Sequence, residues 1–318
     1  MTRIHPRYSA RKLFVSLCFS VTLGACAVTA PEAPGIAPLA NHAEKNVPDV
    51  DLLRVSPAMR EFVEVHAVDR GRGNEKAWSL AHAALNPYVF PFDYNPQVTL
   101  PADQAFQAKT GNCLTFSSIF IAMARSAGLD AWYQEIQIPT SWSSVNETLL
   151  VSKHVNAVIQ HEGRKYTVDV SLLEQDDSHR ARRLSDREAT AQFYNNLGAD
   201  ALVQNKLAQA FAYFKKALGT HPNLAYVWSN LGVVMNRNAQ TDDAILAYET
   251  ALAIDPGQDV AINNLYSIFE EQGRADAMAD LQRRAERNRR RNPYYLHHLA
   301  EEAFEEQRWS DASELANR

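Results

Sequence analysis

Apolar side chains recur at helical spacing in the stretch that follows the turn dipeptide Gly111-Asn112. Positions 116, 119, 120, 123, 124 and 127 fall on one face, which predicts a helix of about fourteen residues with a buried side. Gly128 follows as a stop signal, and Asn112 is suited to cap the helix start. Cys113 is therefore expected in the first turn, where the positive end of the helix dipole favours a thiolate.

The segments on either side of this helix predict a mixed domain. Helical spacing occurs over residues 59–68 and 77–85, and the proline-rich aromatic segment 86–96 suits a loop. After the helix, alternating residues over 131–138 predict a strand, and 139–146 is expected to be a loop. Helices before Cys113 and strands after it indicate an α+β domain.

A hairpin is predicted next, because residues 149–160 and 165–172 are rich in β-formers and flank a turn at 161–164. A two-residue turn centred on Glu162-Gly163 pairs His154 with Ser171 and Asn156 with Asp169. His154 and Asp169 then form a diagonal pair on one face, about 7–8 Å apart at Cα and within side-chain reach. A turn of odd length would place them on opposite faces, so the inference depends on the register.

The last third of the chain repeats every 34 residues. Three rows of residues fall in register: Leu197, Leu231, Leu265 and Leu299; Tyr194, Trp228, Ile262 and Leu296; Ala210, Ala244, Met278 and Ala312. Two repeats are clear, the third is degenerate, and the fourth reaches the end of the sequence. The pattern resembles the tetratricopeptide repeat, whose helix pairs stack so that neighbours bury each other's apolar faces. The resemblance implies an all-α solenoid over 190–318.

The concave side of such a solenoid usually binds a peptide or protein. Four small polar pairs precede the repeated leucines and are expected to line it: Asn195-Asn196, Ser229-Asn230, Asn263-Asn264 and His297-His298. The alternative is that these residues fill gaps between helices. A protein or peptide partner in this groove is the prediction.

Composition excludes some classes of function. The 318 residues are 46% apolar and 22% charged, which is ordinary globular composition and leaves room for two domains. The net charge is −5, and residues 1–26 hold four basic and no acidic residues, so the remainder carries −9. Such a charge argues against a nucleic-acid partner. Neither metal-ligand spacing nor a phosphate loop occurs, so no metal and no cofactor is predicted.

The N-terminus has the pattern of a secretory signal, with basic residues up to Lys12 and an apolar core at 13–23. Leu23-Gly24-Ala25-Cys26 resembles a bacterial lipobox, whose cysteine becomes the lipid-modified first residue of the mature chain. The alternative is an ordinary cleaved signal with an incidental cysteine. Ala27 resembles the outer-membrane sorting pattern, so the resemblance implies an envelope protein on the periplasmic face of the outer membrane, bound to the membrane through lipid on Cys26.

These assignments simplify the cysteine count. Cys18 leaves with the signal and Cys26 carries lipid, so Cys113 remains without a partner for an internal disulfide. A single free thiol in an exported protein is a candidate nucleophile. The alternative for Cys113 is a small buried apolar residue, which is a common fate of cysteine.

Four motifs occur in order along the α+β region: Gly-Asn-Cys-Leu-x-Phe from 111, Ala-Arg-x-Ala-Gly-Leu from 124, Tyr-Gln-Glu at 133–135 and His-Val-Asn at 154–156. With Tyr166-Thr167-Val168-Asp169, they resemble the transglutaminase-like superfamily, a relative of the papain-like cysteine proteases. The resemblance implies a Cys-bearing helix on an antiparallel sheet whose adjacent strands carry His and Asp. More narrowly, it points to bacterial envelope proteins that join this domain to tetratricopeptide repeats.

The resemblance implies a catalytic triad of Cys113, His154 and Asp169. Cys113 would attack a carbonyl, His154 would move the proton, and Asp169 would orient the imidazole. An oxyanion hole would use the Cys113 N–H and a side-chain donor, for which Gln107, Trp132 and Asn156 are candidates. Many such domains have an aromatic residue two positions after the histidine, where this chain has Asn156. That departure leaves the wall of the substrate site open.

The sequence thus predicts an α+β transglutaminase-like (papain-like) domain followed by an all-α tetratricopeptide solenoid. The expected divisions are a lipoprotein signal (1–26), a flexible Ala/Pro-rich tether (27–48), the transglutaminase-like domain (49–180), a charged linker (181–189) and the repeats (190–318). The leading functional hypothesis is a cysteine peptidase or amidase whose repeats recruit a protein or peptide. The alternative is an inert transglutaminase fold that serves as a scaffold, with the repeats binding partners.

Overall fold

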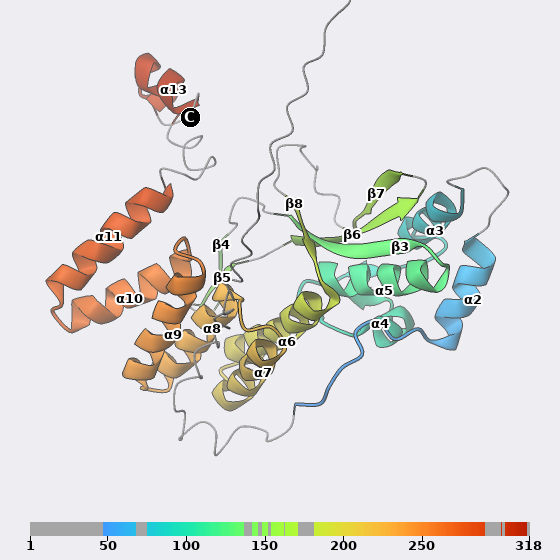
Figure 1. Cartoon of the computed structure of the whole chain (residues 1–318), viewed down its shortest axis with the longest axis horizontal. Helices are drawn as coiled ribbons and strands as arrows, with labels where there is room; N and C mark the ends of the chain where they lie inside the picture. Colours follow the sequence, from blue (N-terminus) through green and yellow to red (C-terminus); the bar gives the residue numbers. More distant parts are fainter. Residues whose placement is uncertain are drawn as a thin grey trace, which may run out of the picture. The chain divides into compact units, whose positions relative to one another are not determined.

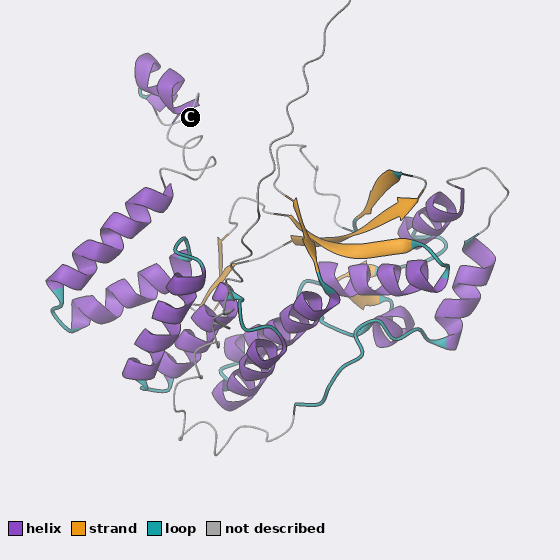
Figure 2. Cartoon of the chain, in the orientation of Figure 1, coloured by secondary structure: helices purple, strands orange, loops and turns teal. Residues whose placement is uncertain are grey.

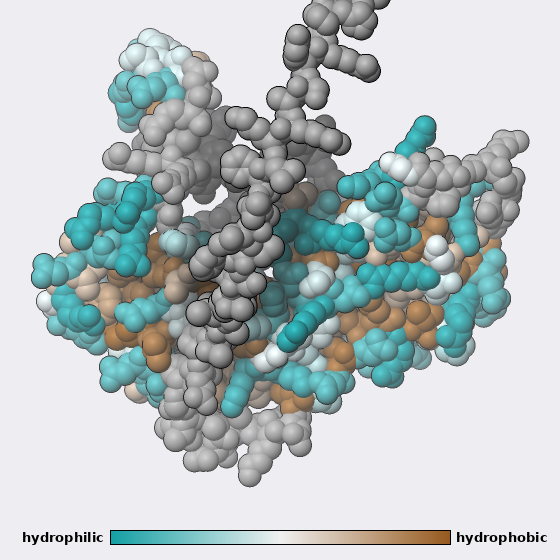
Figure 3. Space-filling view, viewed as in Figure 1, coloured by the Kyte–Doolittle hydropathy of each residue, from teal (hydrophilic) through white to brown (hydrophobic). Residues whose placement is uncertain are grey.

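We describe the protein from a computed structural model (Figure 1). The structure describes residues 47–67, 75–136, 142–145, 148–151, 154–161, 163–170, 181–289, 300 and 303–316. The predicted signal, the lipobox and nearly all of the tether lie outside the described residues, as do His297 and His298. No helix in the described part of the chain is long and apolar enough to cross a membrane. The face shown in Figure 3 mixes hydrophilic and apolar side chains.

Helices and two short strands precede Cys113 in the described chain, and Cys113 itself begins a further helix. In chain order they are α2 (Pro57–His66), α3 (Glu75–Leu85), β1 (Asp93–Tyr94), α4 (Ala102–Ala108), β2 (Thr110–Gly111) and α5 (Cys113–Ser126). The predicted Cys113 helix is confirmed as α5, with Asn112 as its N-cap. Every residue from Leu114 to Ala124 is buried, so α5 forms the centre of this domain.

One face of α5 packs against a four-stranded antiparallel sheet of order β7-β6-β3-β8 (Figure 2). Its strands are β3 (Asp130–Ile136), β6 (His154–His161), β7 (Arg164–Val168) and β8 (Ala181–Leu184). The Tyr133 hydroxyl of β3 donates to Ser118 Oγ of α5 at 2.8 Å, and Ser117 Oγ donates to the Val155 carbonyl of β6 at 3.3 Å. These bonds satisfy buried polar groups at the interface of helix and sheet.

The predicted hairpin has the predicted register, since β6 and β7 pair Ala157 with Val168 and His161 with Arg164. Extending the same register by one position sets Asn156 opposite Asp169. The predicted strand lengths are wrong, however. Residues 148–151 form a separate strand, β5 (Thr148–Val151), which pairs with β4 (Trp142–Val145) where a loop was expected. The β-formers of the predicted segment 149–160 therefore belong to two strands, β5 and β6, which composition alone does not separate.

The predicted linker at 181–189 is also wrong. Residues 181–184 form β8, an edge strand that pairs with β3, and α6 begins at Asp186 behind a Ser185–Glu188 capping box. Three of the charges that made this segment resemble a linker, those of Arg182, Asp186 and Glu188, are engaged in ion pairs. Arg182 contacts Glu135 of β3 at 2.8 Å and Glu188 of α6 at 2.5 Å. Strand β8 therefore connects the sheet directly to the first repeat helix.

The repeat region is helical, as predicted. Its described helices are α6 (Asp186–Val203), α7 (Leu207–Thr220), α8 (Ala225–Arg237), α9 (Thr241–Ile254), α10 (Asp259–Glu271), α11 (Ala275–Arg289) and α13 (Trp309–Ala316). Equivalent positions of successive repeats make equivalent contacts. The helix backbone at Gly198 lies against the Phe214 ring, and 34 residues later Gly232 lies against the Tyr248 ring.

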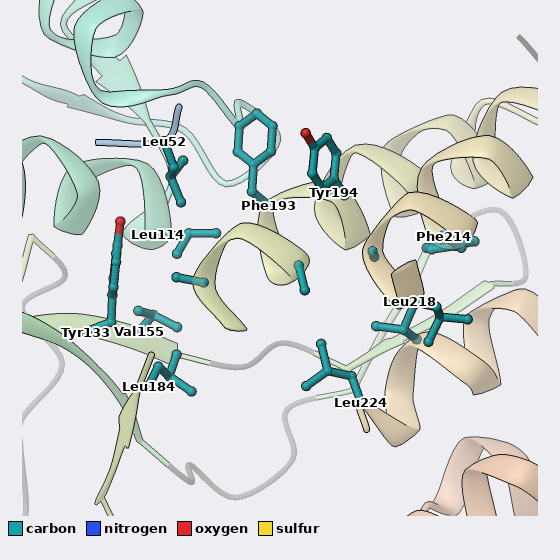
Figure 4. Close-up of a cluster of buried hydrophobic side chains, with 14 of the residues drawn as sticks. Leu52, Leu114, Tyr133, Val155, Leu184, Phe193, Tyr194, Phe214, Leu218 and Leu224 are labelled. Carbon is teal, nitrogen blue, oxygen red and sulfur yellow. The ribbon is translucent and has the colours of Figure 1, made fainter. Parts of the chain in front are cut away.

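The two regions share one apolar core (Figure 4). Leu114, Tyr133, Val155 and Leu184 belong to the same buried cluster as Phe193 and Tyr194 of α6. Polar contacts reinforce this junction. The Tyr194 hydroxyl accepts from the Val50 N–H at 3.0 Å and donates to the Pro48 carbonyl at 2.8 Å. Arg125 at the end of α5 binds Asp186 through two contacts of 2.5 and 2.9 Å.

Arg182 is expected to matter for stability more than its half-exposed side chain suggests. Replacing Arg182 with alanine leaves Glu135, which is 5% exposed, without this counter-charge. We expect the free energy of unfolding to fall by about 2 kcal/mol, a value reduced for the solvent that reaches Arg182. Urea unfolding measures the loss. Arg183→Ala is the control, because the guanidinium carbon of Arg183 lies over the Trp132 ring, 4.3 Å from the ring centroid. Equal losses in both variants would contradict the ion-pair argument.

Candidate functional site

Cys113 is the first residue of α5, and the turn before it is held by several bonds. The Asn112 side chain accepts from the Thr115 N–H at 3.0 Å and donates to Thr99 Oγ1 at 2.8 Å. Strand β1 pairs with β2 so that Tyr94 lies beside Gly111. The N–H groups of a first helical turn have no partner within the helix. The Cys113 thiol is therefore presented at a fixed helix end with backbone donors around it.

His154 begins β6, and Asp169 follows the end of β7. His154 is buried, with 6% of the residue exposed, and its Nε2 contacts Asp169 Oδ2. Its other interactions include a hydrogen bond with Cys113. The structure thus brings together the three residues that the sequence singled out, and the diagonal contact of His154 with Asp169 follows from the hairpin register.

Asn156, at the position where the family pattern often has an aromatic residue, contacts Asp169. Its Nδ2 donates to Asp169 Oδ2 at 3.4 Å, while its buried Oδ1 has no hydrogen-bond partner among the described residues. The opposite amide orientation would bring an oxygen toward the carboxylate, so Asp169 fixes which way the amide points. We interpret Asn156 as a positioning residue for Asp169.

The electrostatics of His154 favour its protonated form. Burial on its own lowers the pKa of His154, but the hydrogen bonds with Asp169 and Cys113 and the charges of both groups outweigh it and raise the pKa from 6.5 to about 9. A protonated ring has two N–H donors, so it can serve Asp169 and the sulfur together. At neutral pH the site therefore holds an imidazolium between two acceptors.

This shift predicts a pH dependence of stability. Because the folded-state pKa of His154 is raised, its contribution is fully present below the unfolded value of 6.5 and is lost as the pH rises through about 9. We expect this loss to be about 3 kcal/mol in the free energy of unfolding, since one pKa unit corresponds to about 1.4 kcal/mol. Urea unfolding from pH 6 to pH 9.5 measures it, with His154→Gln as the reference protein. If both proteins showed the same pH dependence, the shift would be refuted.

Cys113 opens on a cavity of about 640 Å³, which we call the Cys113 cavity. The loop after β1, the start of α5 and the inner side of the repeat helices contribute its walls. The described lining residues are Tyr94, Asn95, Pro96, Gln97, Val98, Thr99, Asn112, Cys113, Leu114, Val155, Gln192, Asn195, Asn196, Ala199, Asp200, Val203, Gln204, Tyr226, Ser229, Asn230, Gln258 and Val260. The repeats are therefore part of the cavity and not only neighbours of it.

Two of the four polar pairs predicted for the repeat groove lie in this lining. Asn195 and Asn230 also bind each other, with Asn230 Nδ2 donating to Asn195 Oδ1 at 2.9 Å. Asn263 and Asn264 are not among the lining residues, and Asn264 donates to the Val260 carbonyl of its own helix at 2.8 Å. Two of the pairs thus line the Cys113 cavity, and the binding of a partner by these residues stays a prediction.

Tyr94 is a site residue that sequence reasoning missed. Burial raises the pKa of Tyr94, and negative charge on Cys113 and Asp169 raises it further. The phenol therefore stays protonated and offers a hydrogen-bond donor close to the thiol. Its position in the aromatic, proline-rich segment 86–96 was the available signal, but a loop gives no pattern from which to infer a neighbour.

The structure places the three candidates for a side-chain oxyanion donor in different surroundings. Gln107 is exposed on α4 and does not line the Cys113 cavity. The Trp132 ring lies beneath Arg183 and Lys165, whose cationic groups are 4.3 and 5.9 Å from its centroid. Asn156 is bound to Asp169. Spacing along the chain suggested Gln107, but α4 ends at Ala108 and a left-handed residue, Lys109, turns the chain before Cys113.

Among the described residues, no group of three or more His, Cys, Asp or Glu side chains is arranged to hold a metal ion.

Known proteins resemble the two regions separately. Residues 67–159 match the family model of the transglutaminase-like superfamily, a range that includes Cys113 and His154 and stops before Asp169. A solved crystal structure of MamA is 24% identical, over 31% of this chain and 57% of that chain, with a TM-score of 0.30.

The repeats have a curated relative. The chloroplastic tetratricopeptide repeat domain-containing protein PYG7 of Arabidopsis thaliana is 33% identical over 76 residues, which are 24% of this chain. The match spans a quarter of the length of that relative. Taken with the 34-residue period and the paired helices, these findings show that the chain joins a transglutaminase-like domain to tetratricopeptide repeats.

Proposed function

We propose that the protein is a cysteine hydrolase that cleaves an amide bond in a protein or peptide held between Cys113 and the repeats. The observation that carries this proposal is the contact series Cys113–His154–Asp169, whose cysteine lines a cavity that is walled in part by repeat helices. A buried His and Asp pair beside a helix-terminal thiol is the arrangement that nucleophilic catalysis by cysteine requires.

Each residue has a role in this chemistry. The Cys113 sulfur attacks the carbonyl carbon, and the Cys113 N–H and the Tyr94 hydroxyl are donors available to the oxygen that becomes negative. The C–N bond breaks as His154 gives its proton to the departing amine, which leaves a thioester. Water then attacks the thioester, with His154 as base, and releases the acid and the thiol. Asp169 holds the ring and its charge throughout.

The nature of the cavity supports a peptide substrate. Its repeat wall carries side-chain amides and hydroxyls, among them Gln192, Asn195, Asn196, Ser229 and Asn230. Such groups bind the N–H and C=O groups of an extended chain, which must exchange bonds with water for bonds with protein. In this proposal, the tetratricopeptide repeats bind the peptide substrate beside the Cys113 thiol.

Acyl transfer to Cys113 tests the proposal without knowledge of the substrate. Purified full-length protein is mixed with p-nitrophenyl acetate, and mass spectrometry looks for an acetyl thioester on Cys113 alongside a burst of p-nitrophenolate. The Cys113→Ser protein is expected to show neither. If the wild-type thiol remained unacylated while the protein was folded, the proposal would fail, and the inert scaffold would be the better interpretation.

We also propose that the protein is attached to the bacterial envelope through lipid on Cys26. The lipobox and the signal pattern of the sequence support this. Growth with an alkyne-bearing palmitate tests it, because label should enter the wild type and be absent from Cys26→Ser. Equal labelling of the two proteins would rule out the anchor.

A further inference from the structure

The described lining of the Cys113 cavity holds one acidic side chain. Among its described lining residues, Asp200 of α6 is the sole carboxylic acid, and no lysine, arginine or histidine occurs there. The other lining side chains are amides, hydroxyls, apolar groups, two tyrosines and the thiol itself. Within this described lining, the carboxyl group of Asp200 is therefore the fixed negative charge on the repeat wall.

Asp200 stands on the same helix face as the amides of the wall. Gln192, Asn196 and Asp200 are spaced four residues apart on α6, and all three line the cavity. Because a helix rises 1.5 Å per residue, this row extends for about 12 Å. An extended peptide covers that length with about four residues. A substrate that lies along α6 can thus contact the amides and the carboxyl group at once.

The surroundings of Asp200 leave its charge uncompensated within the described chain. Burial raises the pKa of Asp200 to about 6, and no described cationic group offsets that effect. Asp186, at the first turn of the same helix, is bound by Arg125. A carboxyl group that is removed from water without a cation gains most when a ligand brings one.

We propose that Asp200 is a specificity residue that binds a positively charged group of the substrate, a lysine or arginine side chain or a free amino terminus. This inference rests on the proposed function, because it assumes that the substrate lies in the Cys113 cavity. It adds a substrate class, since the repeats would select cationic segments for the thiol. Asp200 lies on repeat helix α6, whereas Cys113, which lines the same cavity, belongs to the transglutaminase-like domain.

A binding measurement tests the proposal separately from catalysis. Full-length Cys113→Ser protein is titrated into fluorescein-labelled seven-residue alanine peptides in which one position is lysine, norleucine or glutamate, with that position moved along the peptide. At one or more positions the lysine peptide is expected to bind about tenfold more tightly than its norleucine counterpart, which is the usual strength of a charge-assisted hydrogen bond. Glutamate at that position should bind more weakly than norleucine.

Three further variants assign the preference to Asp200. In Asp200→Asn the lysine-to-norleucine ratio should fall to about one, while Asp200→Glu, which keeps the charge, should retain most of it. Asp242→Asn removes the same charge from an exposed position of α9 outside the cavity lining and should leave the ratio unchanged. Circular dichroism confirms that each variant is folded.

The outcomes separate this inference from the proposed function. A lysine preference that survives Asp200→Asn, or the lack of any lysine preference, overturns the role of Asp200, even if Cys113 forms the thioester. Failure of every peptide to bind overturns it as well. A preference lost in Asp200→Asn, together with a thiol that cannot be acylated, supports a cation-binding groove and refutes the hydrolase.

Discussion

Replacing His154 with alanine is expected to slow acylation of Cys113 by p-nitrophenyl acetate about a hundredfold at pH 7, because general acid–base groups contribute factors of this size or more. The ring is buried, contacts Asp169 and bonds with Cys113, so its removal takes away the partner of the thiol. Pre-steady-state release of p-nitrophenolate measures the rate.

His82→Ala is the matched control for this prediction. His82 lies on α3, stacked on the Trp78 ring at 5.0 Å, and is not part of the Cys113 cavity. Its variant should react at the wild-type rate. Asp169→Asn preserves shape while removing charge, and we expect an intermediate loss of about tenfold or more. If the His154 and His82 variants were equally fast, His154 would be a buried core histidine and the triad would be wrong.

Replacing Gly232 with leucine is expected to lower the free energy of unfolding by about 3 kcal/mol, because overpacking a filled core forces side chains and backbone to move. A Cβ atom at position 232 would lie 2.6 Å from the Tyr248 ring, which is fully buried. The substituted side chain cannot share that space with the ring. Thermal and urea unfolding of the full chain measure the effect.

Gly219 offers the comparison within the same repeats. It lies in helix α7, where an added Cβ meets nothing within 4 Å. Gly219→Leu should therefore be neutral or slightly stabilising, since leucine has a higher helix propensity than glycine. Gly198→Leu should resemble Gly232→Leu, because its Cβ would lie 2.6 Å from the Phe214 ring. Similar unfolding curves for the Gly219 and Gly232 variants would contradict the close packing inferred here.

Several features of the fold were determined by local sequence. The apolar period and the Asn112 cap predicted α5, because both signals act within a few residues of one another. The two-residue turn at Glu162-Gly163 predicted the register of β6 and β7, and with it the contact between His154 and Asp169. The 34-residue period predicted the helical repeats, and the structure shows that Gly198 and Gly232 make equivalent contacts at that period.

Other features depended on contacts between distant parts of the chain. Residues 181–184 have the composition of a linker, and they form a strand because β3 presents a free edge and the buried Glu135 attracts Arg182. Tyr94 and Asn156 gained their roles from their placement beside the thiol and beside Asp169. No periodicity marks such neighbours.

The sequence by itself thus determined the two kinds of domain, the helix that carries Cys113 and the pairing of His154 with Asp169, since each follows from spacing along the chain. Only the tertiary structure decided that the repeats form a wall of the Cys113 cavity and that Asp200 is among its described lining residues. The physical reason is that the packing of α6 against the sheet depends on one shared core, from Leu114 and Val155 to Phe193, and residues so far apart in sequence leave no common local pattern.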